Sequence, residues 1–259
     1  MTVTLLQGDC IELMKSIPDQ SVDLILTDPP YGTTACSWDC VIPFEPMWKE
    51  LKRIIKPSCA IVLFGQEPFS SLLRVSNLEW FKYDWYWRKS RPSGFVNAKL
   101  KPLKDIEIIS VFSNGSTANG AKSNMTYYPQ GVAEVSKEWS RPENYTGTKG
   151  VSPSRKSHKL QRTITNEGYP RQILDYPNPN KTVLHPTQKP VPLMEYLIKT
   201  YSNEGETVLD FTMGSGTTGV AAANANRNFI GIEKDEEYFK IAKERIEEAY
   251  NRPLEKFFK

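Results

Sequence analysis

Short apolar runs alternate with amphipathic segments along the first part of the chain. Three apolar runs have the length of buried strands, over residues 2–6, 22–27 and 60–65. Apolar side chains recur at helical spacing over residues 11–17, 47–55 and 69–73. Pro18 and Pro57 are expected to end the first two of these helices. The alternation of strand and helix predicts parallel βαβ units.

The pattern changes after residue 80. Two strand-like runs, 83–88 and 106–112, have little helical periodicity between them and predict an antiparallel pair at the edge of the sheet. Residues 113–184 are rich in Ser, Asn, Thr, Gly and Pro and show no sustained period. Such a long irregular stretch is usually functional or disordered. Its aromatic residues argue against full disorder.

Regular periodicity returns at residue 185. Leu193, Leu197 and Tyr201 mark one face of a helix. The remaining predicted elements are a strand at 207–210, a helix at 217–226, a strand at 228–233 and a helix at 238–249. The chain is therefore predicted to be α/β, with a mostly parallel sheet.

Composition narrows this picture only slightly. A chain of 259 residues with 39% hydrophobic content buries one large core, or a core and a smaller appendage. A net charge of +3 does not identify a partner. The four cysteines are expected to be free thiols and no metal site is expected, because no second Cys/His pair follows Cys36 and Cys40 at zinc-like spacing.

The N-terminal residues do not have the pattern of a signal peptide. No stretch approaches the roughly 20 apolar residues of a membrane span. A soluble protein in the cytoplasm of a prokaryotic or phage-infected cell is expected.

The segment Asp28-Pro29-Pro30-Tyr31 directly follows the apolar run 22–27. The two prolines lack backbone donors and fix their own φ angles, so the chain leaves the sheet there as a stiff loop. A carboxylate and an aromatic ring are then held at the carboxyl end of a strand, where open α/β sheets bind ligands. The alternative is a turn with a surface Asp and a packed Tyr.

A second candidate site follows the predicted strand 207–210. Gly214, Gly216 and Gly219 fit G-x-G-x-x-G between a strand and a helix, and Glu233 ends the next strand. This pattern is typical of dinucleotide binding and leaves a nicotinamide or flavin oxidoreductase open. S-adenosylmethionine also has an adenosine ribose, and Asp210 is placed to take its ammonium, which favours S-adenosylmethionine.

Together, the two motifs resemble those of the DNA amino-methyltransferases that act on adenine N6 or cytosine N4. The catalytic motif precedes the cofactor motif, which is similar to the permuted order of the beta group. Residues 185–190, His-Pro-Thr-Gln-Lys-Pro, are similar to the family segment before the cofactor strand. The resemblance covers about residues 1–112 and 185–250.

Two positions depart from the family pattern. Asp210 is followed by Phe211 and Thr212, where the family commonly has Asp-Pro-Phe. The family's His-Glu pair near the last strands corresponds here to Ile106 and Glu107.

The resemblance implies a Rossmann-like S-adenosylmethionine-dependent methyltransferase fold with a seven-stranded, mostly parallel sheet. It divides the chain into a catalytic half (1–112), an inserted target recognition region (113–184) and a cofactor-binding half (185–259). The catalytic residues that it implies are Asp28, Pro29, Pro30 and Tyr31. The cofactor-binding residues that it implies are Asp9, Cys10, Thr187, Lys189, Asp210, Phe211, Gly214, Ser215, Gly216, Thr217 and Glu233.

The family mechanism assigns each of these groups a task. Asp28 and the Pro29 carbonyl accept hydrogen bonds from the amino group of a base, and Tyr31 stacks on the flipped ring. Lys189 and Thr187 lie near the methionine end of the cofactor.

A basic stretch over residues 82–104 points to nucleic acid. It has seven Lys or Arg and one acid, with aromatic residues among them, and favours a groove along phosphates over a solvated face. Residues 113–184 add ten Lys or Arg against five acids. The predicted DNA-binding residues are Arg88, Lys89, Arg91, Lys99 and Lys101.

The sequence thus predicts methyl transfer from S-adenosylmethionine to adenine N6 in double-stranded DNA. Adenine is preferred because aspartate at position 28 is more typical of adenine enzymes, whereas cytosine-N4 enzymes often have serine. The alternatives are a cytosine-N4 enzyme, then an RNA or protein-amide methyltransferase, or a non-catalytic DNA-binding relative. A homodimer and a cognate restriction nuclease are left open as partners.

Overall fold

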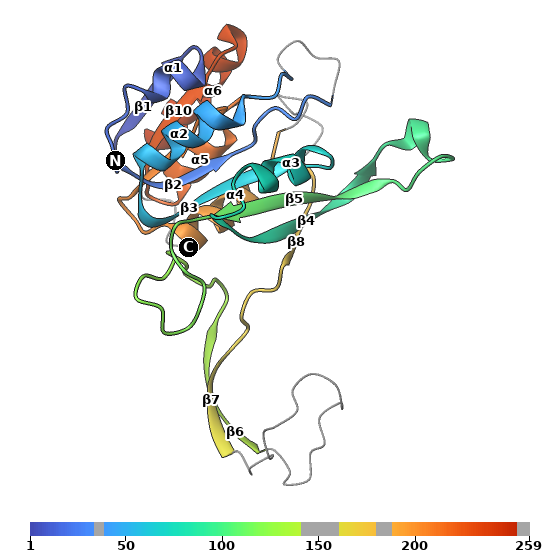
Figure 1. Cartoon of the computed structure of the whole chain (residues 1–259), viewed down its shortest axis with the longest axis vertical. Coiled ribbons are helices and arrows are strands. Elements are labelled where there is room, and N and C mark those ends of the chain that lie inside the picture. Colours follow the sequence, from blue (N-terminus) through green and yellow to red (C-terminus); the bar gives the residue numbers. More distant parts are fainter. Residues whose placement is uncertain (34–38, 141–160, 180–187, 253–259) are drawn as a thin grey trace. The chain divides into compact units, whose positions relative to one another are not determined.

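The computed structural model describes residues 1–33, 39–140, 161–179 and 188–252 (Figure 1). The chain divides into two compact units. The larger unit consists of Met1–Tyr128 and Gln172–Lys259, and the smaller unit is Pro129–Arg171. Within the described ranges, no helix is both long and apolar enough to cross a membrane.

An eight-stranded sheet forms the centre of the larger unit, in the order β1-β10-β9-β2-β3-β5-β4-β8. Its strands are β1 (Val3–Gln7), β2 (Val22–Thr27), β3 (Ile55–Gly65), β4 (Phe81–Ser93), β5 (Lys104–Phe112), β8 (Ile173–Tyr176), β9 (Thr207–Asp210) and β10 (Asn228–Glu233). The first five strands of this order are parallel, whereas β5 is antiparallel to β3 and β4. The predicted mostly parallel sheet with an antiparallel pair is confirmed.

Helices cover both faces of this sheet (Figure 1). They are α1 (Cys10–Met14), α2 (Phe44–Ile54), α3 (Phe69–Ser76), α4 (Val191–Tyr201), α5 (Thr217–Asn224) and α6 (Glu236–Tyr250). Leu24 and Leu26 of β2 pack in a core with residues of α4, α5 and α6, whereas Ile25 packs in a core with residues of α1, α2 and α3. Successive side chains of a strand point to opposite faces, so β2 contributes to both cores.

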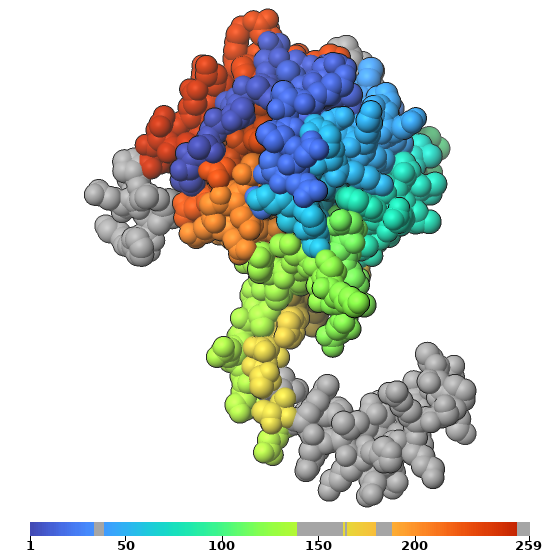
Figure 2. Space-filling view, turned by 60° about the vertical axis from the view of Figure 1, so that its left-hand side comes forward, coloured from blue at the N-terminus to red at the C-terminus, as the bar shows by residue number. Residues whose placement is uncertain are grey.

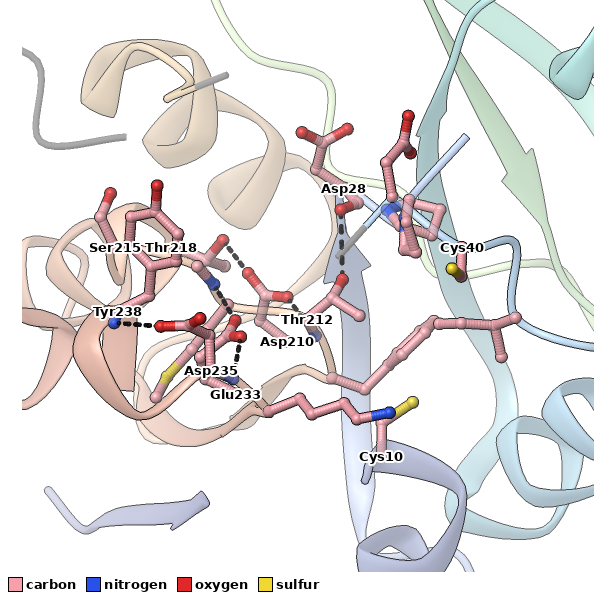
Figure 3. A pocket seen from close by; sticks show the side chains of 18 of the residues that line it. Cys10, Asp28, Cys40, Asp210, Thr212, Ser215, Thr218, Glu233, Asp235 and Tyr238 are labelled. Carbon is pink, nitrogen blue, oxygen red and sulfur yellow. Dashed lines mark hydrogen bonds between the residues drawn. The ribbon is translucent and has the colours of Figure 1, made fainter. Parts of the chain in front are cut away.

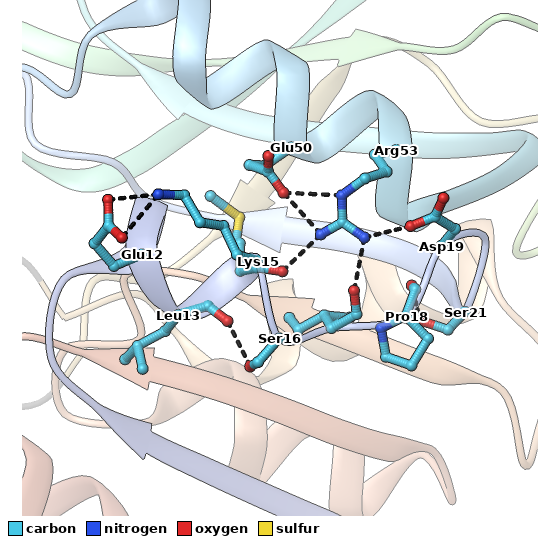
Figure 4. A network of polar contacts seen from close by, with 11 residues as sticks. Glu12, Leu13, Lys15, Ser16, Pro18, Asp19, Ser21, Glu50 and Arg53 are labelled. Atoms are coloured by element: carbon cyan, nitrogen blue, oxygen red, sulfur yellow. Dashed lines mark hydrogen bonds and ion pairs between the residues drawn. The ribbon is translucent and has the colours of Figure 1, made fainter.

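Arg53 of α2 fixes the connection that leads into β2 (Figure 4). Its guanidinium donates to the carbonyl oxygens of Met14 and Ile17, each at 2.8 Å. It also pairs with the carboxylates of Asp19 and Glu50, at 2.5 and 2.7 Å. Because Arg has several donors in one plane, a single side chain satisfies the carbonyls that end α1 and joins them to α2.

The strand order brings the two predicted motifs together. β1 pairs with β10, so the N-terminal residues lie against the C-terminal part of the chain (Figure 2). β9 lies between β10 and β2, and all three are parallel. Their carboxyl ends, at Glu233, Asp210 and Thr27, therefore meet at one edge of the sheet, where such folds bind ligands.

Two predictions for residues 113–184 need correction. The sheet has eight strands rather than seven, because β8 adds to β4 from within this region. The region also contains an antiparallel pair, β6 (Ala133–Ser140) and β7 (Gln161–Glu167). β7 is mostly polar, and in β6 the alternation of Ala133, Val135 and Trp139 is interrupted by Lys137, so the apolar alternation that predicts a strand is weak. The smaller unit is shorter at both ends than the predicted insertion.

The prediction that Pro57 ends a helix is wrong. β3 already begins at Ile55, and Pro57 lies within it. The register between β2 and β3 shifts between Val22 and Leu24, and Ser58 has a φ of 64°. Pro57 thus lies at a bulge, which is one of the few places where a strand tolerates proline.

Candidate active site

The 28–31 segment begins directly after β2, all of whose residues are buried. The Tyr31 ring packs against the Phe69 ring, with centroids 5.1 Å apart. The backbone N–H groups of Gly32 and Thr33 both donate to the Asp39 carboxylate, each at 2.8 Å. Gly32 has a φ of 67°, which glycine adopts without strain. These contacts hold the loop close to the end of the strand.

Asp28 belongs to a network of buried charges. Its carboxylate contacts the Lys189 ammonium and accepts a hydrogen bond from the Tyr31 hydroxyl. Lys189 also pairs with Glu107 of β5 at 2.8 Å, and Glu107 pairs with Lys89 of β4 at 2.6 Å. The Lys189 and Glu107 side chains are only 7% and 6% exposed. Asp28, Lys189, Glu107 and Lys89 are called the ion-pair network below.

The environment changes the pKa of each acid in this network. Burial raises the pKa of Asp28; Lys189 opposes this shift, and the negative charge of Glu107 adds to it. Burial also opposes ionisation of Glu107, but the ammonium groups of Lys189 and Lys89 outweigh it and hold its pKa below the usual range. Lys189 stays protonated because the two carboxylates raise its pKa against the effect of burial.

A cavity of about 630 Å³ opens at the edge of the sheet where both motifs end (Figure 3). Its volume is in the range of small-molecule sites. The predicted residues that line it are Asp9, Cys10, Asp28, Pro29, Pro30, Tyr31, Lys189, Asp210, Phe211, Gly214, Ser215, Thr217 and Glu233. Gly216 does not line it: a Cβ there would lie 3.0 Å from Ala242, so this glycine allows α5 and α6 to pack. Thr187 lies outside the described residues.

Asp210 is buried at the bottom of this site. Its carboxylate accepts hydrogen bonds from the hydroxyls of Thr27 and Thr218 and from the backbone N–H of Thr212. Burial raises the pKa of Asp210 to about 6, although these donors oppose the shift. The carboxylate thus ties the ends of β2 and β9 to the start of α5.

Glu233 orders the glycine loop. One of its carboxylate oxygens accepts from the Gly214 N–H and the other from the Asp235 N–H, each at 2.8 Å (Figure 3). Burial raises the pKa of Glu233. The predicted strand-end acid is therefore on the cavity wall beside the glycine loop.

The cavity fits the expected cofactor. Glu233 lies on its wall with acceptor lone pairs beyond the two N–H groups that it binds, and these suit ribose hydroxyls. Among the described residues, the buried Thr217 hydroxyl on the same wall has no hydrogen-bond partner. A buried polar group without a partner is costly, so a ligand that supplies one is expected there.

The fold and this site together define a class of protein. A mostly parallel α/β sheet carries a glycine loop and an Asp-Pro-Pro-Tyr segment around one cavity, and this is the arrangement of an S-adenosylmethionine-dependent amino-methyltransferase. The family described as DNA methylase, with N6- and N4-type members, matches residues 22–244. The chain belongs to this family.

Known relatives cover nearly the whole chain. The Type II methyltransferase M.HinfI of Haemophilus influenzae is 28% identical over 284 residues, which span 96% of this chain and 70% of the relative. The DNA adenine methyltransferase YhdJ of Escherichia coli (strain K12) is 28% identical over 277 residues, spanning 99% and 86% of the two chains. The protein is thus an S-adenosylmethionine-dependent DNA methyltransferase of the N6/N4 family.

Solved structures agree with this assignment. The M1.HpyAVI–SAM complex aligns with a TM-score of 0.62 at 26% identity, over 95% of this chain and 99% of that one. The cytosine-N4-specific PvuII DNA methyltransferase aligns with a TM-score of 0.63 at 17% identity, over 97% and 92%, and shares the fold.

The basic stretch is not one continuous surface. Arg88 pairs with Asp175, and Lys89 is in the ion-pair network. Arg91 is exposed and donates to the Pro179 carbonyl, whereas Lys99 and Lys101 are exposed in the loop between β4 and β5. The structure therefore separates Lys89 from the other four predicted DNA-binding residues.

Sequence reasoning missed the part that Glu107 plays. The signal was an acid within the apolar run 106–112, which alternation places on a buried face. A buried acid needs a cation, and Lys89 is two positions from Trp87, which is the cross-strand partner of Glu107. Pairing each buried acid with a cation on the facing strand of the predicted hairpin identifies Glu107 and Lys89.

Proposed function

We propose that this protein transfers a methyl group to the N6 amino group of adenine in a flipped-out nucleotide of double-stranded DNA. One observation carries the proposal: the Asp28 carboxylate, kept in contact with a cation, is on the wall of the same cavity as the glycine loop and Glu233. The aspartate at position 28 and the relative YhdJ, a DNA adenine methyltransferase, favour adenine over cytosine.

The target explains why a carboxylate is needed. The lone pair of an exocyclic amino nitrogen is delocalised into the base, which makes it a poor nucleophile. Asp28 and the Pro29 carbonyl accept its two N–H bonds and draw the nitrogen toward a tetrahedral form. Tyr31 stacks on the ring, and much of the rate comes from holding the amino group in line with the methyl donor. With the cofactor bound, the nitrogen–methyl bond would form as the sulfur–methyl bond breaks and leaves a neutral thioether, and the methylated nitrogen would then lose one of its protons.

The cofactor residues divide by chemistry. Glu233 accepts the ribose hydroxyls, Asp9 and Cys10 border the adenine, and Asp210 with the 211–217 loop holds the amino-acid end. S-adenosylmethionine supplies a methyl group on a positively charged sulfur. The buried carboxylates at the edge of the sheet suit a ligand with this charge.

The remaining assignments complete the proposal. Residues 1–112 and 185–259 form the two halves of the methyltransferase domain, and 113–184 supply target recognition. Arg88, Arg91, Lys99 and Lys101 contact DNA. A homodimer, a cognate restriction nuclease and a cytoplasmic location are proposed with them.

Base identity is the decisive test of this function. We expect expression in a methylation-deficient host to produce N6-methyladenine at one recognition sequence, read by mass spectrometry of nucleosides and modification-sensitive sequencing of host DNA. A host expressing the Asp28→Ala variant is the matched control and should lack the modification. N4-methylcytosine in its place would reverse the base preference.

A further inference from the structure

Asp28 does not stand alone at the site, because three charged side chains extend from it into the core. Lys189 bridges Asp28 and Glu107, and Lys89 closes the series on the other oxygen of Glu107. Lys189 lies just before α4, Glu107 is on β5 and Lys89 is on β4. The two positive and two negative charges cancel, so the network is buried without net charge.

The contacts within the ion-pair network fix the orientation of the Asp28 carboxylate. Lys189 and the Tyr31 hydroxyl engage one oxygen each of Asp28, which fixes the plane of the carboxylate. Lys189 itself is held by Glu107 and lies over the Phe64 ring, 5.1 Å from its centroid. A hydrogen-bond acceptor of a catalytic amino group must keep both its charge and its orientation.

We propose that Glu107 and Lys89 are positioning residues that act through Lys189: Glu107 holds Lys189 so that the Asp28 carboxylate stays turned toward the cavity, and Lys89 offsets the negative charge that Glu107 places near Asp28. This inference rests on the proposed function of Asp28. In it, Lys189 is the ion-pair partner of the Asp28 carboxylate. The charged or titratable groups that face Asp28 are Lys189, Glu107, Tyr31 and Asp210.

Opposite pH shifts test this inference. Methyl transfer fails as the pH falls through the pKa of Asp28, because protonation removes the acceptor. Glu107→Gln removes a negative charge that raises this pKa, so the acid limb of kcat should move to lower pH. Lys89→Met leaves Lys189 as the one cation paired with Glu107 among the described residues, so less of the Lys189 charge is left to balance Asp28. The pKa of Asp28 should therefore rise, and the acid limb of kcat should move to higher pH. With Lys189 less firmly held, kcat on the plateau should fall roughly tenfold in Glu107→Gln, while KM for DNA stays unchanged.

A remote ion pair supplies the matched control. Lys56, near the start of β3, pairs at 2.6 Å with the buried Asp23, near the start of β2, and neither residue lines the cavity. Lys56→Met should lower the melting temperature and leave the pH profile unchanged.

Transfer of tritiated methyl groups to unmethylated phage DNA is measured for all three variants, with their melting temperatures. Profiles that do not move, or that move in the same direction, overturn the inference; a wild-type protein without transfer overturns the proposed function instead.

A different observation carries a second inference, at the tip of the β4–β5 hairpin. Every residue from Ser93 to Pro102 is exposed, including Phe95, Val96 and Leu100 at 64%, 99% and 84%. Such apolar exposure at a loop tip usually marks an interaction site. Figure 1 shows the hairpin extending beyond the rest of the sheet.

The register places this tip on the catalytic side of the sheet. The carboxyl end of β3, at Gly65, pairs with Ile108, and the hairpin continues past that point to the Ser93–Lys104 pair. β3 is parallel to β2, whose carboxyl end leads into Asp28. The apolar tip thus projects from the same edge as the cavity.

The positive charge around the hairpin tip favours a negatively charged partner. Residues 91–105 have four Lys or Arg and one acid. We infer that the tip binds double-stranded DNA, with Phe95, Val96 and Leu100 entering the base stack beside the flipped nucleotide and Lys99 and Lys101 on the phosphates. Proteins that unstack DNA use apolar wedges of this kind between basic side chains.

Single-stranded DNA separates this inference from a general loss of activity. The Phe95→Ser/Val96→Ser variant should lose roughly tenfold or more in kcat/KM on native phage DNA, and nothing on the same DNA after heat denaturation, which has no duplex stack to open. Leu78→Ser removes a leucine that is 67% exposed outside the hairpin and should leave both rates unchanged.

Two results overturn the second inference. One is equal loss on native and denatured DNA. The other is a wild-type dimer that the double variant converts to a monomer in analytical ultracentrifugation, which assigns the tip to a second copy of the chain. Lys99→Gln/Lys101→Gln should reduce the slope of log K against log salt by about 2, at about 0.9 per phosphate contact.

Discussion

Asp28→Ala is expected to abolish methyl transfer while S-adenosylmethionine still binds within about tenfold of wild type, roughly 1.4 kcal/mol. Alanine removes the acceptor for the target amino group but leaves Glu233 and the glycine loop intact. Lys189 keeps its ion pair with Glu107, so one buried partner remains for its charge. Transfer of a tritiated methyl group and calorimetric titration with cofactor measure the two effects separately.

Asp28→Asn is the matched control for charge. It has nearly the same shape and keeps one acceptor oxygen, but it cannot balance the Lys189 ammonium. We expect weak residual transfer and a lower melting temperature, because a buried cation loses half of its compensation. Turnover near the wild-type rate in Asp28→Ala, with cofactor binding preserved, would contradict the role of Asp28 as acceptor.

Glu233→Gln is expected to weaken S-adenosylmethionine binding roughly 10- to 100-fold, from the loss of a charged hydrogen-bond acceptor. Each oxygen of the carboxylate now accepts one backbone N–H, from Gly214 and from Asp235. An amide has only one acceptor oxygen, so one of these N–H groups would face an NH2 group. The glycine loop loses its anchor at the same time as the ribose loses its acceptor.

Calorimetric titration measures this loss directly, without DNA. Glu237→Gln is the control, because Glu237 is an exposed acid on the neighbouring helix α6 and is not on the cavity wall. Its cofactor affinity should equal that of wild type. If Glu233→Gln binds as tightly as Glu237→Gln, Glu233 does not contact the cofactor.

Local pattern was sufficient for most of the fold. The apolar run 22–27 coincides with β2, and the run 228–233 with β10. Buried parallel strands give continuous apolar segments, and amphipathic helices have a period that repeats over several turns. β6 and β7 were missed because their apolar positions are few or interrupted, and β8 was missed because four residues are too few to show a period. Pro57 misled the prediction because a bulge, visible only in the pairing of β3 with β2, accommodates it.

The sequence by itself determined the identity of both motifs and their place at strand ends, because short segments with Gly, Pro and Asp restrict the backbone locally. Only the tertiary structure decided which charges meet. Asp28, Lys89, Glu107 and Lys189 are far apart along the chain, and their pairing depends on the order β2-β3-β5-β4 and on the start of α4. Lys89, which the sequence predicts to contact phosphates, is thus half-buried against Glu107, because a buried carboxylate requires a cation there.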